Sequence, residues 1–270
     1  MKNISALSPL PFYQGTDLRY QHHRKSYAFG NVFPLISYRD MLLPFQISIY
    51  KPHEPVVRGD LEFGLFHFDG TLIGDITSPI KNKGLDVIDY GDISVIKYPA
   101  IAALGLNISE GRYFLRMTTK EGEYYSEVFT VCNSIDKYLC LEYKNSQALQ
   151  KKDEVVDFFN DFTFRVYLCT QVGKPEYLFE ENAIDRMGYT FIESQVSKKI
   201  HKFTFVAPEY LCDALRLVKL CDYKKITSNG LKYYPMTFDM NVDWEEQGDL
   251  ASVECSFETD TVIVNTGGAK

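Results

Sequence analysis

The sequence predicts a mainly β protein, with an antiparallel β-sandwich followed by a second β-rich domain that carries one short helix. Short runs of alternating apolar and polar residues recur with turn residues roughly every 8 to 12 positions, a spacing typical of sandwiches. Aromatic residues make up 14% of the 270 residues, and such side chains suit half-buried pleated surfaces. Only one segment has a clear helical period.

Residues 1–40 are rich in Pro, Gly, Tyr and polar residues and have little periodicity. We predict an extended N-terminal arm with a few short strands, of the kind that wraps a neighbouring subunit or stays disordered. The basic cluster from Arg19 to Lys25 could touch nucleic acid or an acidic partner, but a solvated part of this arm explains it more simply.

Residues 41–133 form the predicted sandwich. In "PFQISIY" the residues Phe45, Ile47 and Ile49 alternate onto one face. The clearest hairpin is "GRYFLRMTTKEGEYYSEVFTVCN", with a turn at residues 120–122 and one return strand over residues 124–131. This ending resembles the last two strands of an immunoglobulin or fibronectin-type module, and the resemblance implies an immunoglobulin-like sandwich.

Residues 134–270 form the predicted second β-rich domain, with a helix near 208–220. Pro208 and Glu209 suit the start of that helix, and Leu211, Ala214, Leu215 and Val218 follow the helical i, i+3, i+4, i+7 spacing. No Pro/Gly linker separates the domains near residue 135, so we expect them to share an interface.

The stretch "LFHFDGTLIGD" is similar to the nucleophile motif of haloacid-dehalogenase-type phosphatases. His67 stands where that family has its nucleophilic Asp, and Asp69 matches only the acid/base carboxylate. The following "TLIGDITSPIKNKG" has no helical period, whereas the family motif opens onto a helix. We therefore interpret residues 61–73 as a β-hairpin with a type I′ turn at Asp69-Gly70.

Other candidates for chemistry are weak. The acids in "DWEEQGD", Asp243 to Asp249, do not follow a Ca²⁺-loop pattern, and they and "FEENAIDR", Phe179 to Arg186, are interpreted as acidic loops. His201 is interpreted as a surface residue of a strand, and Trp244 as a core or interface anchor. His22 and His23 are adjacent, which is poor geometry for one metal.

The six cysteines contain no C-x-x-C pair and are expected to be mostly buried free thiols of a reducing compartment. We predict no catalytic residue, no cofactor-binding residue and no metal ligand. The net charge of −7 argues against nucleic-acid binding through phosphates. No apolar run reaches the roughly 20 residues needed to span a bilayer, and we see no signal peptide.

The C-terminal half carries a family resemblance. "DRMGYTFIESQVSKKIHKFTFVAPEYLCDALRLVKLCDYKKI" and "YYPMTFDMNVDWEEQGDLASVECSFETDTVIVN" resemble a group of uncharacterised virion structural proteins of Bacteroidota tailed phages and prophages, over about residues 110–265. The resemblance implies a neck, tail or baseplate protein that assembles in the host cytoplasm, binds other virion proteins and forms a homo-oligomeric ring. It transfers no active-site residue.

Two other function classes stay open. A carbohydrate-binding or adhesion module would use exposed aromatic residues such as Tyr124, Tyr125 or Trp244. An enzyme would use Asp69 or the acids at 243–249. Export and a glycan-array signal would favour the first, and a hydrolase activity lost in Asp69→Asn would favour the second.

Overall fold

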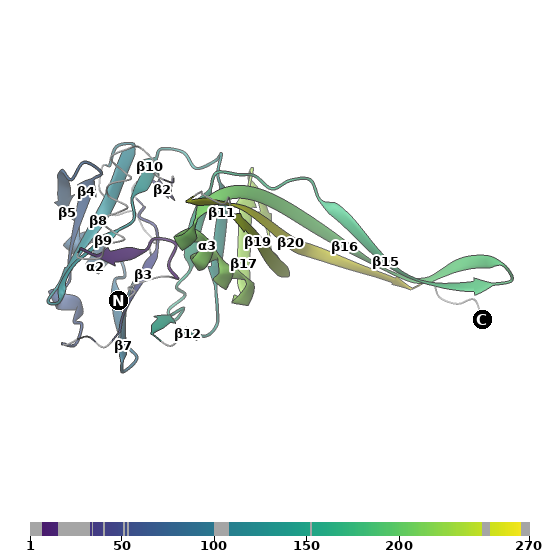
Figure 1. Ribbon diagram of the computed structural model, residues 1–270, viewed down its shortest axis with the longest axis horizontal. Coiled ribbons are helices and arrows are strands. Elements are labelled where there is room, and N and C mark those ends of the chain that lie inside the picture. The colour runs from purple at the N-terminus through teal and green to yellow at the C-terminus, as the bar shows by residue number, and fades with distance from the viewer. Residues whose placement is uncertain are drawn as a thin grey trace.

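The computed structural model describes residues 7–15, 33, 35–39, 41–50, 52, 54–99, 108–151, 153–244 and 249–265. Figure 1 shows two β-rich bodies packed side by side, with a long β-ribbon projecting from the second body. The predicted class is confirmed: the protein is mainly β, and a sandwich-like body precedes a second β-rich body.

The first body has two sheets packed face to face. The seven-stranded sheet follows the order β1-β9-β8-β10-β2, with β4 paired to β8 and β5 paired to β4, and the smaller sheet follows the order β3-β7-β6. Their bounds are β1 (Phe12–Gln14), β2 (Leu35–Tyr38), β3 (Phe45–Tyr50), β4 (Glu62–His67), β5 (Leu72–Asp75), β6 (Asp86–Asp89), β7 (Ile93–Tyr98), β8 (Gly111–Thr119), β9 (Gly122–Ser126) and β10 (Phe129–Cys132).

Alternation along the strands builds the core of this body. The predicted inward residues Phe45, Ile47 and Ile49 of β3 are buried, and they pack in one cluster with Phe63 of β4 and Leu115 of β8. Burying each such side chain contributes roughly 1.5–3 kcal/mol, which explains why the period-2 pattern predicted these strands.

The described parts of the segment 1–40 join this sheet. β1 pairs antiparallel with β9, and β2 pairs in parallel with β10. Phe12 and Leu35 lie in the first core, while Leu7 packs in the core of the second body. The segment thus adds strands to the sandwich rather than extending away from it at these positions, because its apolar residues are buried there.

The predicted hairpin at residues 61–73 is present, but its turn differs. The amide of Gly70 donates to His67 O (2.9 Å) and that of His67 to Thr71 O (2.8 Å). Gly70 has φ +93°, whereas Asp69 is not in the positive-φ region. This is a three-residue loop with Gly in the left-handed position, not the predicted type I′ turn, which needs positive φ at both central residues.

The segment after this hairpin forms a helix that the sequence did not predict. Helix α2 (Thr77–Asn82) follows β5, and Ile76 and Ile80 are buried one turn apart. A helix of six residues has fewer than two turns, which is too short for a helical period to appear in the sequence.

The predicted return strand over residues 124–131 is divided. β9 ends at Ser126 and β10 begins at Phe129. The amide of Glu127 between them donates to Pro11 O (2.9 Å), and its carboxyl side chain is buried. The chain therefore shifts here from pairing with β1 to pairing with β2.

The second body also consists of two sheets and a helix around one core. The order is β14-β11-β17-β18 in one sheet and β15-β16-β20-β19 in the other, beside the small ribbon β12-β13. The bounds are β11 (Leu139–Lys144), β12 (Leu149–Lys151), β13 (Glu154–Val156), β14 (Phe164–Leu168), β15 (Glu176–Arg186), β16 (Tyr189–Pro208), β17 (Tyr223–Ser228), β18 (Leu231–Tyr233), β19 (Thr237–Trp244) and β20 (Leu250–Asn265).

The predicted helix near 208–220 is confirmed. It consists of α3 (Glu209–Leu215) and the 3₁₀ turn η2 (Arg216–Leu220), with Pro208 at the N-cap. All four residues of the predicted apolar stripe are buried against the second core: Leu211, Ala214, Leu215 and Val218.

The two bodies share a polar interface. Lys97 Nζ on β7 lies 2.7 Å from Asp157 Oδ2, and these two side chains are 4% and 0% exposed. The Asp157 amide donates to Gln46 Oε1 (2.9 Å), and Ser48 Oγ donates to Val155 O (2.9 Å). Residues 155–157 therefore cover the outer face of β3 and β7, which fixes the two bodies against each other.

Within the described ranges, no helix is long and apolar enough to cross a membrane.

Candidate interaction surface

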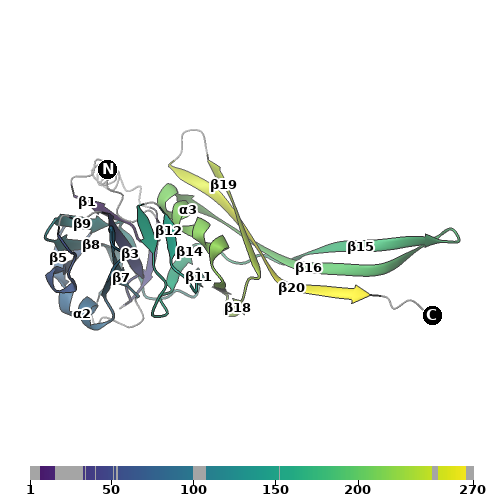
Figure 2. The ribbon, with the colours of Figure 1, turned by 90° about the horizontal axis from the view of Figure 1, so that it is seen from below.

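The most distinctive feature of the molecule is the projecting ribbon, which we call the β-arm. It comprises β15, residues 189–200 of β16 and residues 260–265 of β20, and it extends well beyond both bodies in two perpendicular views (Figures 1 and 2). β16 pairs with β15 on one side and with β20 on the other, and β19 pairs only with residues 251–258 of β20. Among the described residues, the arm therefore has three strands from its base to Ser194 and two strands from there to its tip.

The tip of the β-arm is a strained two-residue turn. Arg186 pairs with Tyr189, and Met187 and Gly188 between them have φ of +56° and +79°. A type I′ turn of this kind favours Asn-Gly, and a left-handed residue other than Gly costs roughly 1–2 kcal/mol. Met187 bears that cost and is 100% exposed. A strained, fully exposed apolar side chain at a tip points to contact with another molecule.

No described segment of the chain covers either face of the β-arm. Directly paired residues point to the same face, so Phe179 and Val262 share one face with Ser197, while Leu178 lies on the other face with Lys198. Ten large apolar side chains of the arm are exposed: Tyr177, Leu178, Phe179, Met187, Tyr189, Phe191, Ile192, Val262, Ile263 and Val264. The distal hairpin from Ala183 to Glu193 has only two strands, and an isolated two-stranded hairpin is only marginally stable in water. Large exposed apolar surfaces are typical of interaction sites.

Charges follow the edge strand of the β-arm. Lys198 Nζ lies 2.9 Å from Glu180 Oε1, and Lys202 Nζ lies 2.8 Å from Glu176 Oε2. These pairs are exposed and stabilise the fold by less than about 1 kcal/mol. Charged side chains on an edge strand do, however, oppose addition of a further strand. The arm is therefore suited to contacts through its faces and tip.

The sequence interpretation of "FEENAIDR" as an acidic loop is wrong. Phe179 to Arg186 lie in β15 and pair with β16 from Tyr189 to Ser197. Glu, Asn and Asp are uncommon in strands, so the sequence of this segment did not indicate a strand. The apolar run from Tyr177 to Phe179 and the glycine at Gly188 were the available signals.

Asp69 lies in the exposed hairpin loop and His67 ends β4, with Asp69 Oδ2 3.1 Å from His67 Nδ1. The pKa of Asp69 is lowered mainly by hydrogen bonds from the backbone and side chain of Thr71. The carboxylate thus stabilises its own turn, which accounts for it without a reaction.

The interpretation of His201 as a surface residue is wrong. His201 is buried on β16, with its ring stacked on Phe257 at a centroid distance of 5.2 Å and tilted against Tyr233 at 4.9 Å. It lies on the same face as Phe203 and Phe205, so the strand's alternation carries it into the core. Burial lowers the pKa of His201.

The aromatic residues considered for a sugar site differ in how exposed they are. Tyr124 is buried in the first core and cannot stack on a ligand. Trp244 is 44% exposed at the end of β19, so it is not a core anchor. Of the acidic run, Asp243 and Trp244 lie in β19, and residues 245–248 lie outside the described residues.

No group of three or more His, Cys, Asp or Glu side chains in the described part of the chain is placed to hold a metal ion. The six cysteines are free; Cys212, Cys221 and Cys255 are buried, and Cys169 is exposed. His22, His23 and the cluster from Arg19 to Lys25 lie outside the described residues.

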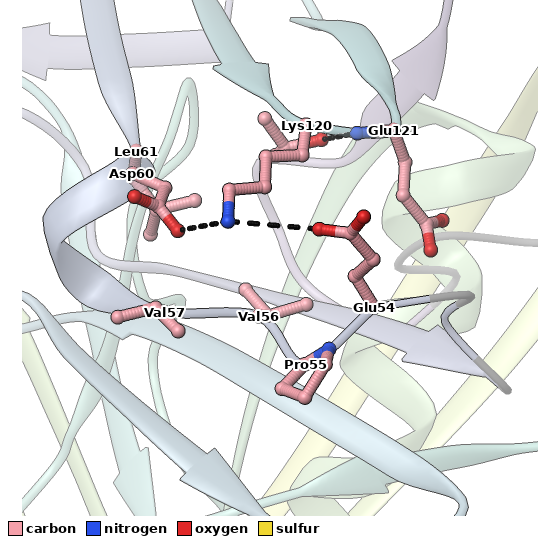
Figure 3. A pocket seen from close by; sticks show the side chains of 9 residues that line it. Glu54, Pro55, Val56, Val57, Asp60, Leu61, Lys120 and Glu121 are labelled. Carbon is pink, nitrogen blue, oxygen red and sulfur yellow. Dashed lines mark hydrogen bonds and ion pairs between the residues drawn. The ribbon is translucent and has the colours of Figure 1, made fainter.

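One hollow lies in the first body and another lies between the two bodies. In the one in Figure 3, Lys120 Nζ lies 3.2 Å from Asp60 Oδ2 and 3.6 Å from Glu54 Oε2, and the remaining volume is about 20 Å³. That is room for about one water molecule. The second is larger, about 420 Å³, and lies beside α2 and the loop at Phe159.

No protein-family model matches the chain, and a search of curated proteins finds no match. The resemblance to virion proteins therefore stays a prediction.

Proposed function

We propose that this chain is a structural component of a tailed phage or prophage virion, in the neck, tail or baseplate, and that it acts by assembling with other protein subunits. The observation that carries the proposal is the β-arm, an uncovered sheet with ten exposed large apolar side chains. The resemblance of the C-terminal half to phage structural proteins gives the setting. Assembly takes place in the host cytoplasm, where free cysteines are expected.

The exposed surface of the β-arm is large enough for a specific interface. Tyr and Phe side chains bury about 150–250 Å² each. Ten partly exposed large residues therefore offer on the order of 800 Å², which is about the contribution of one partner to a standard interface. Burying them would also stabilise the arm, which has no core of its own.

A shortened arm tests this proposal. Leu178 and Lys198 are directly paired, so residues 179–197 can be replaced by Asn-Gly, which closes a shorter type I′ hairpin. We expect the wild-type chain to co-sediment with particles from an induced prophage lysate and the shortened chain to be absent from them. The apparent melting temperature of the two isolated chains should agree within a few degrees.

The matched control is Met236→Asn, which changes an exposed methionine outside the β-arm and should leave incorporation unchanged. The proposal fails if the wild-type chain is absent from the particles, or if the shortened chain enters them as well as the wild type does.

A further inference from the structure

The larger hollow is a basic cleft, which we define by Arg58, Lys81, Lys83, Lys97 and Phe159. It is also lined by Asp86 and has a volume of about 420 Å³. Asp157 neutralises Lys97, so three basic residues face one carboxylate and the cleft has a net charge of about +2. A pocket of this size accommodates a few side chains.

The cleft is held open by the interface between the two bodies. Lys97 Nζ donates to Phe159 O (2.9 Å), and the Phe159 amide donates to Asp157 Oδ1 (2.9 Å). Asn160 and Asp161 both have φ of +57°, so a tight turn presents Phe159 at the cleft. The Phe159 ring is 54% exposed although its backbone is fixed. An apolar side chain is therefore displayed among cations in a preformed site.

The distal part of the β-arm has the complementary chemistry. Residues 181–197 contain the acids Glu181, Asp185 and Glu193 and the single basic residue Arg186, a net charge of 1 − 3 = −2. The apolar side chains Met187, Tyr189 and Phe191 lie at and beside the tip. The distal arm thus combines an apolar tip with a net negative charge along its strands, while the cleft combines an apolar ring with a net positive charge.

We propose that the tip of the β-arm of one copy of this chain inserts into the basic cleft of a second copy. This contact rests on the proposed function, because it names a second copy of the chain as the partner that the assembly surface binds. Pairing of two arms with each other is disfavoured, because both carry the same net negative charge and charged edges.

The position of the two surfaces sets the kind of assembly. Helix α2, which borders the cleft, lies at the end of the molecule opposite the tip of the arm in both views (Figures 1 and 2). The contact therefore joins different surfaces of the two copies. Such heterologous contacts produce a ring when the rotation closes and a filament when it does not.

Two variants each remove one side of the contact. Met187→Asn removes the apolar tip but keeps a residue that favours the type I′ turn, so the hairpin stays folded. Lys83→Glu reverses the charge of an exposed cleft residue. In sedimentation velocity, we expect the wild-type chain to associate with rising concentration and each variant to require roughly ten- to a hundredfold higher concentration.

The matched controls are Met236→Asn and Lys232→Glu, which make the same changes at exposed positions outside both surfaces. They should associate as the wild type does. Thermal unfolding of all four variants verifies that each is folded.

The decisive sample is an equimolar mixture of Met187→Asn and Lys83→Glu. The first retains a wild-type cleft and the second retains a wild-type tip, so the mixture should form a heterodimer and nothing larger. A mixture that stays monomeric, a wild-type chain that stays monomeric, or variants that associate like the wild type would each overturn the inference.

The two proposals fail in distinguishable ways. A chain that is monomeric in solution but enters particles through its β-arm would overturn the tip-to-cleft contact and leave the virion role standing. A chain that forms the heterodimer in the mixture but never enters particles would leave the contact standing and overturn the virion role.

Discussion

Lys97→Met is expected to lower the free energy of unfolding by about 3–5 kcal/mol, because it leaves Asp157 charged and buried without its counter-ion. Lys97 Nζ lies 2.7 Å from Asp157 Oδ2 in a pair that is almost completely buried. Methionine keeps nearly the length and volume of the lysine chain, so the loss reports the charge rather than a cavity. Urea denaturation followed by fluorescence measures it.

A second substitution separates the charge from the packing. In Lys97→Met/Asp157→Asn both charges are absent, and we expect more than half of the lost stability to return. The control Lys198→Met removes an exposed pair with Glu180 and should cost less than about 1 kcal/mol. A loss in Lys97→Met no larger than in this control would show that the buried pair does not hold the two bodies together.

Glu127→Gln is expected to change how stability depends on pH. Burial raises the pKa of Glu127 from 4.5 to about 7, although hydrogen bonds from the Val128 amide and the Tyr13 side chain lower it in part. Between these two values the folded chain binds a proton that the unfolded chain has lost. The contribution of this proton to wild-type stability is therefore complete below about pH 4.5, falls as the pH rises, and is lost above about pH 7.

This rise in the pKa of Glu127 corresponds to about 3 kcal/mol of unfolding free energy. Glu127→Gln removes the titrating group, so its unfolding free energy should fall less between pH 5 and 8, and at pH 8 it should exceed the wild-type value by up to about 3 kcal/mol. Glu62→Gln, at an exposed position of β4, should follow the wild-type curve. An unchanged slope in Glu127→Gln would contradict the assigned pKa.

The sequence predicted the parts of the fold that depend on local periodicity. The strand β3 and the helix α3 were found because Phe45, Ile47 and Ile49, and then Leu211, Ala214 and Leu215, repeat at the strand and helix spacings. The division of β9 from β10 at Glu127 depends on pairing with residues more than ninety positions earlier, which no local pattern contains.

The features that carry the functional proposals were the least visible in the sequence. Lys97 and Asp157 lie 60 positions apart, and nothing in their surroundings marks them as partners. The β-arm was missed because β15 is rich in Glu, Asn and Asp. The exposed hydrophobic residues of the arm stand in consecutive runs such as Val262 to Val264, which are also typical of strands buried on both faces, so a pattern alone cannot distinguish a covered strand from an uncovered one.

Hydrogen exchange compared between the dilute chain and the assembled chain tests most directly whether the β-arm is the assembly surface. In the dilute chain, amides of residues 176–199 and 260–265 should exchange quickly, because the arm has two open edges and uncovered faces. In the assembled chain we predict at least tenfold slower exchange in these residues and around Phe159. Equal exchange of the arm in both samples, with slowing elsewhere on the molecule, would contradict the account.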